Sequence, residues 1–361
     1  PQAKLVELAD AFPDYLEAAY TKLKESPEGE RVTVDEDHRF VGFDGYKGVI
    51  DSCDVILLCE PPNFRAKHLR AAVDAGKHVF AEKPIAVDGA GVRSVMETCR
   101  LAREKKLNIV SGLCYRYQFA KQDVVKRVHD GAVGDIVVLE TKYNTGGLWH
   151  RGSSPDWSEM EYQIRNWIYF NWLSGDHINE QHIHSLDKIA WAMNEYPVKA
   201  TASGGRVVRT DEKYGNVYDH FNTTYEWANG VRGFSSCRQW EGADTDVSDH
   251  VYGTKGVAHI QTHAIEPRGG SAWRHEESGP DDMYQNEHDA LFRAIRNGET
   301  IVDEYMCDST LMAIMGRESA YTGRTVTREE ILNSDVQLGP ENPEWGPSPV
   351  APVPSPGRQE S

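Results

Sequence analysis

The stretch Val79-Phe80-Ala81-Glu82-Lys83-Pro84 decides the fold of this chain. Upstream of it, Val55-Ile-Leu-Leu-Cys-Glu60 is the apolar run of a buried strand. Residues 64–76 then carry apolar side chains at helical spacing as far as Gly76, which ends the helix. Residues 78–81 form a second short apolar strand. The sequence therefore predicts a β-α-β unit, with two parallel strands joined by a right-handed crossover.

The loops that follow these strands, Pro61-Pro62-Asn63 and Glu82-Lys83-Pro84, are predicted to lie at the same edge of the sheet. Ligands of such sheets bind just beyond the carboxyl ends of the parallel strands. Lys83 is held by a turn that Pro84 stiffens, so it is well placed to contact a bound cofactor and its substrate. On the residues alone, an ordinary solvated lysine explains this position equally well.

The unbroken run Ala75-Gly-Lys-His-Val-Phe-Ala-Glu-Lys-Pro84 resembles the signature of the Gfo/Idh/MocA family (glucose–fructose oxidoreductase, inositol dehydrogenase and rhizopine catabolism). The resemblance implies an α/β Rossmann dinucleotide-binding domain and an α+β domain with a mostly antiparallel open sheet. It also implies that Lys83 touches both the nicotinamide cofactor and the reacting hydroxyl. Further cofactor-binding residues are expected in the same two loops: Pro61, Asn63 and Glu82. Where the family usually has a His, four residues after Pro61, this chain has Arg65.

Length and composition indicate a two-domain globular protein. The chain has 361 residues, of which 39% are hydrophobic, and its formal net charge is −17. This charge, without any basic run, disfavours nucleic acid and anionic membrane as partners. No stretch approaches the ~20 apolar residues of a membrane span. The six cysteines show neither a CxxC pair nor a zinc spacing, so we expect buried free thiols.

Residues 4–10 are predicted to form a strand that ends in an acid, Asp10. The acid after the second strand of a dinucleotide fold hydrogen-bonds the adenosine ribose. No Arg follows at once to hold a 2′-phosphate, so NAD is favoured over NADP. A cap or turn acid before Pro13 is the alternative explanation. The sequence contains no G-x-G-x-x-G, and we expect the first strand and its Gly-rich loop to lie upstream of Pro1.

The hydrophobic pattern changes at about Asp135 from helix-rich to alternating, and Asn229-Gly230 predicts a hairpin between two of the later strands. We expect residues 1–117 to form the Rossmann domain and residues 118–303 the substrate-binding and oligomerisation domain. Helix 304–323 is expected to pack back on the first domain. Residues 334–361 should form an extended arm, because the chain from Pro340 onward holds 7 of the 17 prolines.

A second constellation lies at Ser174-Gly-Asp-His-Ile-Asn-Glu-Gln-His-Ile-His-Ser-Leu-Asp187. On one continuous helix, His177, Glu180, His184 and Asp187 would form a single polar stripe. Three interpretations remain open: a general acid/base group, a structural polar face, and a metal site of His177, Glu180 and His184. The family resemblance favours the first, with no metal. It implies that His184 transfers the proton and that Glu180 stands at the family's aspartate position. Asp176 and His177 stand where the family has small residues, and we expect these extra polar groups to contact substrate and to tighten its choice.

Three further residues are predicted near the reaction centre. The resemblance places Arg116 near the nicotinamide and the substrate, and Trp167 near the cofactor. Arg165 belongs to the aromatic-rich segment 165–172, which with residues 143–149 suits a carbohydrate pocket. Ordinary core packing explains the same aromatics.

The function that the resemblance implies is that of an NAD-dependent sugar or cyclitol dehydrogenase. Lys83 is the competing candidate for the base. One alternative is a glycoside hydrolase that retains NAD and works by transient C3 oxidation and elimination. The other is a non-catalytic sugar-binding regulator. The open sheet is expected to mediate homo-oligomerisation.

Overall fold

The first domain is built on short parallel strands, as the sequence predicts. The computed structural model describes residues 3–357. Strands β3 (Val55–Leu58), β4 (His78–Ala81) and β5 (Ile109–Ser111) form a three-stranded parallel sheet in the order β3-β4-β5. Helix α3 (Pro62–Asp74) connects β3 to β4. The predicted β-α-β unit is therefore confirmed, and β4 lies at its centre with Val79, Phe80 and Ala81 buried.

A separate parallel pair lies beside this sheet. Strand β1 (Leu8–Asp10) pairs with β2 (Arg39–Val41), and the described residues form no hydrogen-bonded ladder between this pair and β3. In the doubly wound strand order 3-2-1-4-5-6, the two groups correspond to positions 3-2 and 4-5-6. No described residue fills the central position. Asp10 ends β1 as predicted, at the edge where the parallel strands have their carboxyl ends.

The second domain is a nine-stranded sheet in which only β6 and β9 run parallel. The other neighbours are antiparallel, so the predicted mostly antiparallel sheet is confirmed. Gly230, in the predicted β8–β9 hairpin, has a φ of +86°, which glycine adopts without strain. In spatial order the strands are β13 (Trp273–Arg274), β12 (Ala264–Pro267), β11 (Gly256–His259), β10 (Asp246–Gly253), β6 (Ile136–Thr145), β9 (Arg232–Gln239), β8 (His220–Glu226), β7 (Lys199–Gly205) and β14 (Val326–Thr327).

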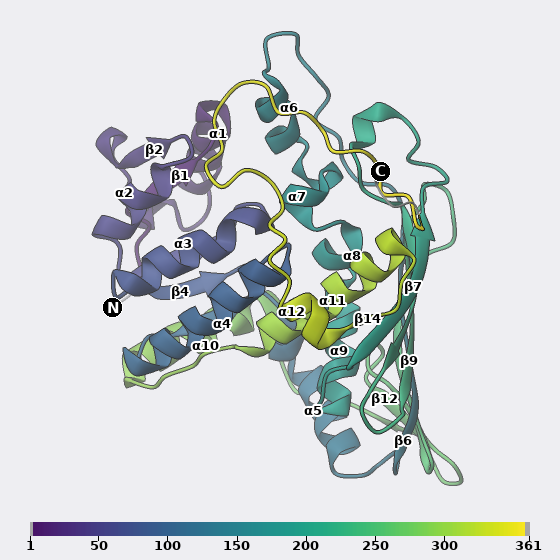
Figure 1. Cartoon of the computed structure of the whole chain (residues 1–361). Helices are drawn as coiled ribbons and strands as arrows, with labels where there is room; N and C mark the ends of the chain where they lie inside the picture. The colour runs from purple at the N-terminus through teal and green to yellow at the C-terminus, as the bar shows by residue number, and fades with distance from the viewer. Residues whose placement is uncertain (1–2, 358–361) are drawn as a thin grey trace.

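Helices cover one face of this sheet (Figure 1). In β9, Ser235, Cys237 and Gln239 are buried on the covered face, whereas Phe234 points to the exposed one. Helix α9 (Ile183–Met193) packs on β6 and β10. Helix α11 (Tyr305–Thr322) packs on β7 and α9 and also contacts α4 (Gly89–Glu104) of the first domain. Because it touches both domains, α11 fixes them against each other.

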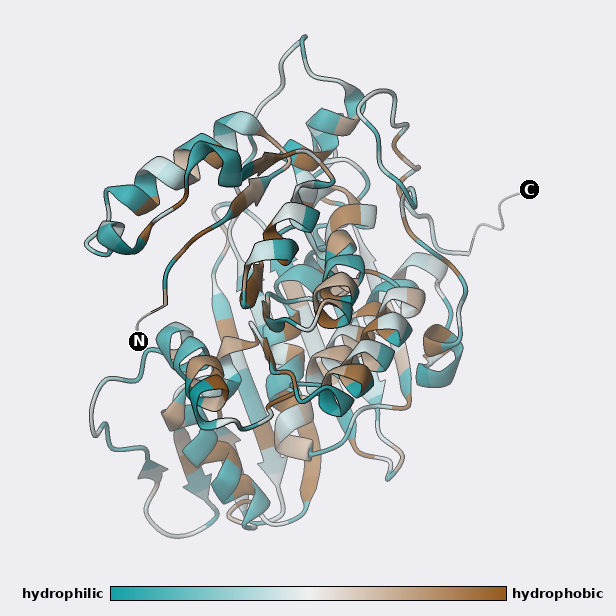
Figure 2. Cartoon of the chain, turned by 90° about the vertical axis from the view of Figure 1, so that its left-hand side faces the viewer, coloured by the Kyte–Doolittle hydropathy of each residue, from teal (hydrophilic) through white to brown (hydrophobic). Residues whose placement is uncertain are grey.

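The remaining helices connect the strands of the two domains. Asp88 caps α4, since its carboxylate accepts from the amide of Gly91 at 2.7 Å. Hydrophobic residues gather on the strands and on the inner sides of the helices (Figure 2). The other helices are α1 (Pro13–Lys24), α2 (Gly45–Ser52), α5 (Phe119–His129), α6 (Glu159–Arg165), α7 (Asn171–Ser174), α8 (His177–Glu180), α10 (Met283–Asn297) and α12 (Arg328–Leu332), with short 3-10 turns that include η3 (Cys114–Tyr117) and η4 (Trp167–Tyr169).

The chain beyond α12 has an extended course. Residues 334–357, called the C-terminal arm below, contain no helix or strand. In Figure 1 the arm runs from α12 up to α1, crosses to α6 and descends beside β7. It therefore lies over both domains.

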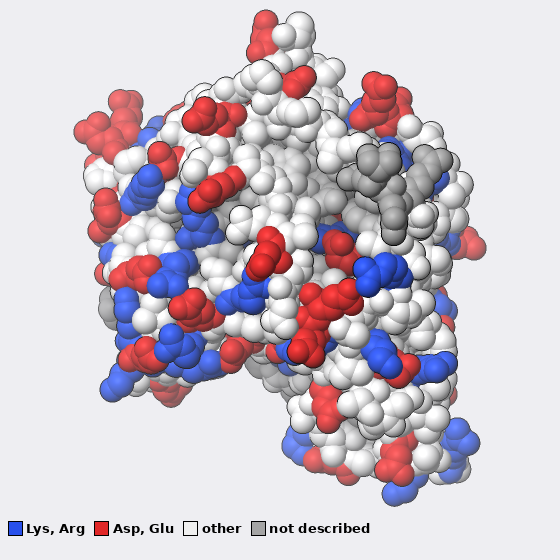
Figure 3. Space-filling view, viewed as in Figure 1, with Lys and Arg blue, Asp and Glu red and all other residues white. Residues whose placement is uncertain are grey.

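The cysteines are free thiols and, with one exception, buried, as the sequence predicts. The exception is Cys59, which is exposed because it follows β3 on the same side as the exposed Leu57. Acidic and basic side chains are interspersed over the face seen in Figure 3. No helix within residues 3–357 is both long and apolar enough to span a bilayer.

Candidate active site

Lys83 lies where the two domains meet. It follows the buried strand β4, and its peptide bond to Pro84 is cis. Its ammonium group donates to Glu180 Oε1 at 2.8 Å and also to the backbone carbonyl of Glu180. Both side chains are 15% exposed. A largely buried ion pair thus joins the carboxyl end of a first-domain strand to the last residue of α8.

His184 stands one turn further along, at the start of α9. Its ring packs edge-on against Tyr115, with centroids 5.2 Å apart. Its buried Nδ1 has no hydrogen-bond partner among the described residues. Burial and the positive charges of Lys83 and Lys188 hold the pKa of His184 well below its ordinary value. The imidazole is therefore neutral at neutral pH, the state in which histidine accepts a proton.

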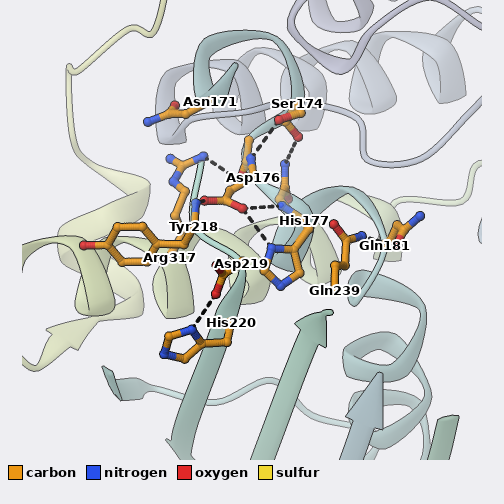
Figure 4. A network of polar contacts seen from close by, with 12 residues as sticks. Asn171, Ser174, Asp176, His177, Gln181, Tyr218, Asp219, His220, Gln239 and Arg317 are labelled. Carbon is orange, nitrogen blue, oxygen red and sulfur yellow. Dashed lines mark hydrogen bonds and ion pairs between the residues drawn. The ribbon is translucent and has the colours of Figure 1, made fainter. Parts of the chain in front are cut away.

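The predicted continuous polar stripe of His177, Glu180, His184 and Asp187 is not formed. The chain leaves helical geometry at Gln181 and His182, so α8 and α9 are separate helices. The Asp176 carboxylate accepts from the Tyr218 amide at 2.7 Å and from the His177 ring at 3.0 Å (Figure 4). It also accepts from the Tyr321 hydroxyl at 2.5 Å.

Asp176 is 0% exposed, so its carboxylate is not available to a substrate in this structure. It instead links α8 to β8 and α11. The alternative of a metal site at His177, Glu180 and His184 is not supported, because His177 pairs with Asp176 while Glu180 pairs with Lys83. Within residues 3–357 no cluster of His, Cys, Asp or Glu has the geometry of a metal site.

The Arg116 side chain forms an ion pair within the protein, with Asp187. Its guanidinium makes hydrogen bonds of 2.8–3.1 Å to both carboxylate oxygens of Asp187, which also accepts from Ser309 at 2.6 Å. It lies 4.0 Å from the ring centroid of Tyr305. The expected contact with nicotinamide and substrate is therefore replaced by a clamp that joins η3, α9 and α11.

Arg165 is engaged in ion pairs within the protein, whereas the predicted cofactor contact of Trp167 stays a prediction. Arg165 pairs with Asp14 at 2.9 Å and with Glu161 at 2.8 Å, and its guanidinium lies 3.9 Å from the ring centroid of Phe12. It therefore stands near Asp10, at the far end of the cofactor edge. Trp167 packs edge-on against Trp149 with centroids 6.3 Å apart.

The predicted cofactor residues lie along the carboxyl edge of the parallel strands. Asp10 is half-buried, and its Oδ1 accepts from the Phe12 amide at 2.9 Å. Pro61 immediately precedes α3. Glu82 accepts from the Lys83 amide at 3.1 Å, close to the backbone of Gly112, where a Cβ would come within 2.6 Å of a Glu82 oxygen. The Asn63 amide, by contrast, donates to the Leu338 carbonyl of the arm at 2.9 Å.

Sequence reasoning missed a support for the Lys83 turn. Arg65 is buried and donates to the Pro84 carbonyl at 2.7 Å and to that of Glu60. It thereby ties the two loops of the cofactor edge together. In the sequence, this role of Arg65 is indicated only by its standing where the family usually has a His. That substitution does not reveal that Arg65 bonds the carbonyls of Pro84 and Glu60.

A pair of buried lysines beneath His184 was also missed. The ammonium groups of Lys121 and Lys188 lie 4.6 and 4.5 Å from the centroid of the Tyr115 ring. Lys188 is fully buried and paired with Asp249. Burial and the charge of Lys188 lower the pKa of Lys121 to about 8. A lysine four residues after His184, on an otherwise apolar helix face, was the signal for Lys188.

The residues present fit two parts of a nicotinamide dinucleotide. Asp10 is an acid at the ribose position, and Lys83 and the unpartnered His184 Nδ1 lie beside the place for the reacting groups. The pyrophosphate would need backbone amides of a Gly-rich turn, and the sequence has no G-x-G-x-x-G. The described residues therefore fit the adenosine end and the nicotinamide end of such a cofactor.

Two family models match the chain. Residues 15–112 match the model described as an oxidoreductase family with an NAD-binding Rossmann fold. Residues 122–259 match the model of the GFO/IDH/MocA C-terminal domain. Together they cover both domains of the fold described above.

Individual relatives are distant. Inositol 2-dehydrogenase of Rhizobium meliloti (strain 1021) is 24% identical over 313 residues, 83% of each chain. The 2,7-anhydro-N-acetylneuraminate hydratase of Escherichia coli (strain K12) is 26% identical over 57% of this chain, which spans only about half (51%) of that relative. A solved levoglucosan dehydrogenase in complex with NADH and levoglucosan has a TM-score of 0.68 at 19% identity, covering 89% of this chain and 90% of that one. This last likeness concerns the fold alone.

Proposed function

Because the chain belongs to the Gfo/Idh/MocA oxidoreductase family, we propose that it transfers a hydride between a hydroxyl-bearing carbon of a sugar, cyclitol or glycoside and the nicotinamide of NAD. The observation that carries the proposal is the proximity of Lys83, Glu180 and a neutral His184 where the two domains meet. NAD, when bound, supplies the hydride acceptor. The chain's own residues bind the substrate and move its proton.

Each of the three residues has a distinct role. His184 takes the proton of the reacting hydroxyl, because its imidazole is neutral. The Lys83 ammonium stabilises the negative charge that develops on the substrate oxygen. Glu180 positions Lys83 through the 2.8 Å ion pair. In the reverse direction the same groups return the proton.

The test is a screen of the purified chain with NAD against free sugars, polyols and chromogenic glycosides, followed at 340 nm. Formation of NADH with a free sugar or polyol supports the proposal. Absence of turnover with every substrate, together with unchanged sugar binding in Lys83 and His184 variants, would favour the regulator instead.

A second candidate function follows from one relative. The chain is similar to a 2,7-anhydro-N-acetylneuraminate hydratase, and hydration involves no net oxidation or reduction. An NAD-retaining glycosidase that works by transient C3 oxidation and elimination would use the same Lys83 and His184. Cleavage of a nitrophenyl glycoside by protein that carries NAD, without net NADH, would establish this candidate over the dehydrogenase.

The preference for NAD over NADP is assigned to Asp10. Replacement by asparagine, Asp10→Asn, keeps an oxygen for the Phe12 amide and removes the charge. We expect kcat/KM for NAD to fall about tenfold, because a charge-assisted hydrogen bond to the ribose is lost. The relative rate with NADP should rise, since the carboxylate no longer repels a 2′-phosphate. The ratio of the two kcat/KM values is the measurement.

The control for this change is Asp51→Asn, which alters an exposed acid on α2. It should leave the NAD to NADP ratio at the wild-type value. A wild-type ratio in Asp10→Asn as well would contradict the role of Asp10.

The open face of the nine-stranded sheet is assigned to self-association. Phe234 of β9 is 48% exposed on the face of the sheet that the helices leave uncovered. We expect a homo-oligomer that Phe234→Glu dissociates, because a charge placed in an apolar interface is left unpaired. Light scattering on the full chain measures the mass. A monomeric wild type would contradict this assignment.

A further inference from the structure

The C-terminal arm is anchored on both domains. Near its start, Leu338 donates to Asp88 at 2.9 Å and accepts from Asn63 at 2.9 Å, both in the first domain. Near its end, the Pro354 carbonyl accepts from Tyr218 of the second domain at 2.8 Å. Figure 1 shows the arm spanning the region between α1 and α6. The segment between the anchors is thus held across the junction of the domains.

Trp345 is the aromatic residue of this spanning segment. Its ring stacks on Phe43, with centroids 4.4 Å apart and planes at 30°, and lies 5.4 Å from the ring of Phe12. It is nevertheless 45% exposed. A tryptophan in a packed core is usually covered on both faces. Here part of the indole remains open although the neighbouring Phe12 is buried.

This open ring lies at the cofactor edge of the parallel strands. Asp10 ends β1 and accepts from the amide of Phe12, whose ring touches Trp345. Phe43 follows the end of β2 by two residues. The carboxyl ends of two parallel strands therefore bring together a carboxylate for ribose hydroxyls and a flat apolar surface.

We propose that Trp345 is the adenine-binding residue of the dinucleotide site and that the C-terminal arm closes the site over the adenosine half of the cofactor. The inference rests on the proposed function, because it requires a nicotinamide dinucleotide. Adenine is planar and apolar on its faces, so it stacks on an indole, while Asp10 next to it takes the ribose.

The arm has a consequence for cofactor release. Since the residues on either side of Trp345 are held by Asn63 and Asp88 on one domain and by Glu159 and Tyr218 on the other, the adenosine can leave only when the arm shifts. A ring supplied by the arm also stabilises the arm when adenine is bound. Cofactor exchange should therefore be slower in the full chain than in one whose Trp345 is removed.

The test compares the binding of two ligands to the full-length chain and its variants. NAD contains adenosine, whereas nicotinamide mononucleotide lacks it. Trp345→Ala should raise the Kd for NAD about tenfold, the size of one lost stacking interaction. The Kd for nicotinamide mononucleotide should be unchanged, and Trp345→Phe should recover most of the NAD affinity. Val350→Ala, which removes a second exposed apolar side chain from the same arm, is the matched control.

Three outcomes would overturn the inference. An unchanged Kd for NAD in Trp345→Ala shows that adenine does not use the indole. A tighter Kd shows that Trp345 occupies the site instead of completing it. An equal rise in the Kd values for NAD and for nicotinamide mononucleotide shows that the substitution disturbs the whole cofactor site. Failure of the proposed function is seen separately, in the wild type alone: if it binds no nucleotide, the proposed function falls and this inference with it.

Discussion

Replacing Lys83 with alanine is expected to lower kcat by about 10²–10³-fold, the effect of removing one positioned group that stabilises transition-state charge. The ammonium group lies just beyond the end of β4, 2.8 Å from Glu180 Oε1, where the two domains meet. Steady-state kinetics with saturating NAD and substrate measure the change. The control is Lys67→Ala, which removes an exposed lysine on α3 and should have no effect.

A double variant separates catalysis from neutralisation of Glu180. Lys83→Ala leaves the Glu180 carboxylate without its cation, and this alone disturbs a site that is only 15% exposed. If Lys83 served only to neutralise Glu180, removal of both side chains would restore turnover. Because Lys83 is assigned to the developing alkoxide, we expect the double variant Lys83→Ala/Glu180→Ala to remain as inactive as the single one. Recovery to within tenfold of wild type would contradict this role.

The parts of the fold that are local in sequence were predicted well. Val55–Leu58, His78–Ala81 and the helix between them are short, strongly apolar and bounded by Pro and Gly. The second-domain strands likewise alternate in burial, as β9 does. The exposure of Cys59 was not predicted, because the composition of a strand does not tell which of its sides is covered.

The structure brings Lys83, Glu180 and His184 close together, as the sequence predicted, and their roles stay predictions. The burial of Asp176 was not predicted, because its partners Tyr218 and Tyr321 lie far away in the sequence. The predicted polar stripe was wrong because it assumed an unbroken helix. The turn at Gln181 and His182 contains neither Gly nor Pro, so nothing in the sequence announces it.

Arg116 and Arg165 show a second limit of sequence reasoning. A guanidinium near aromatic residues suits a ligand, but it suits a carboxylate of the same protein equally well. Asp187 and Asp14 are those carboxylates, and both pairings join segments far apart in the chain. The buried Lys188 and its partner Asp249 were missed for the same reason, since lysine is rarely buried unless it is paired.

His184→Gln should lower kcat by about 10²–10⁴-fold, the usual contribution of a positioned general base. Glutamine keeps a polar side chain of similar reach but cannot accept the proton at neutral pH. Binding of NAD should be retained, because the cofactor ends are assigned to Asp10 and Lys83. A variant that keeps more than a tenth of the wild-type kcat would shift the role of base to Lys83, the competing candidate.

The pH dependence of the wild type tests the same assignment without a mutation. Burial and the charges of Lys83 and Lys188 lower the pKa of His184, so the imidazole stays neutral at a pH where free histidine is protonated. A base is active in its neutral form, and kcat/KM should therefore stay level as the pH falls through the ordinary histidine value of about 6.5. The rate should decline only below it. A decline centred at or above that value would mean that the titrating base is not the histidine enclosed by Tyr115 and the two lysines.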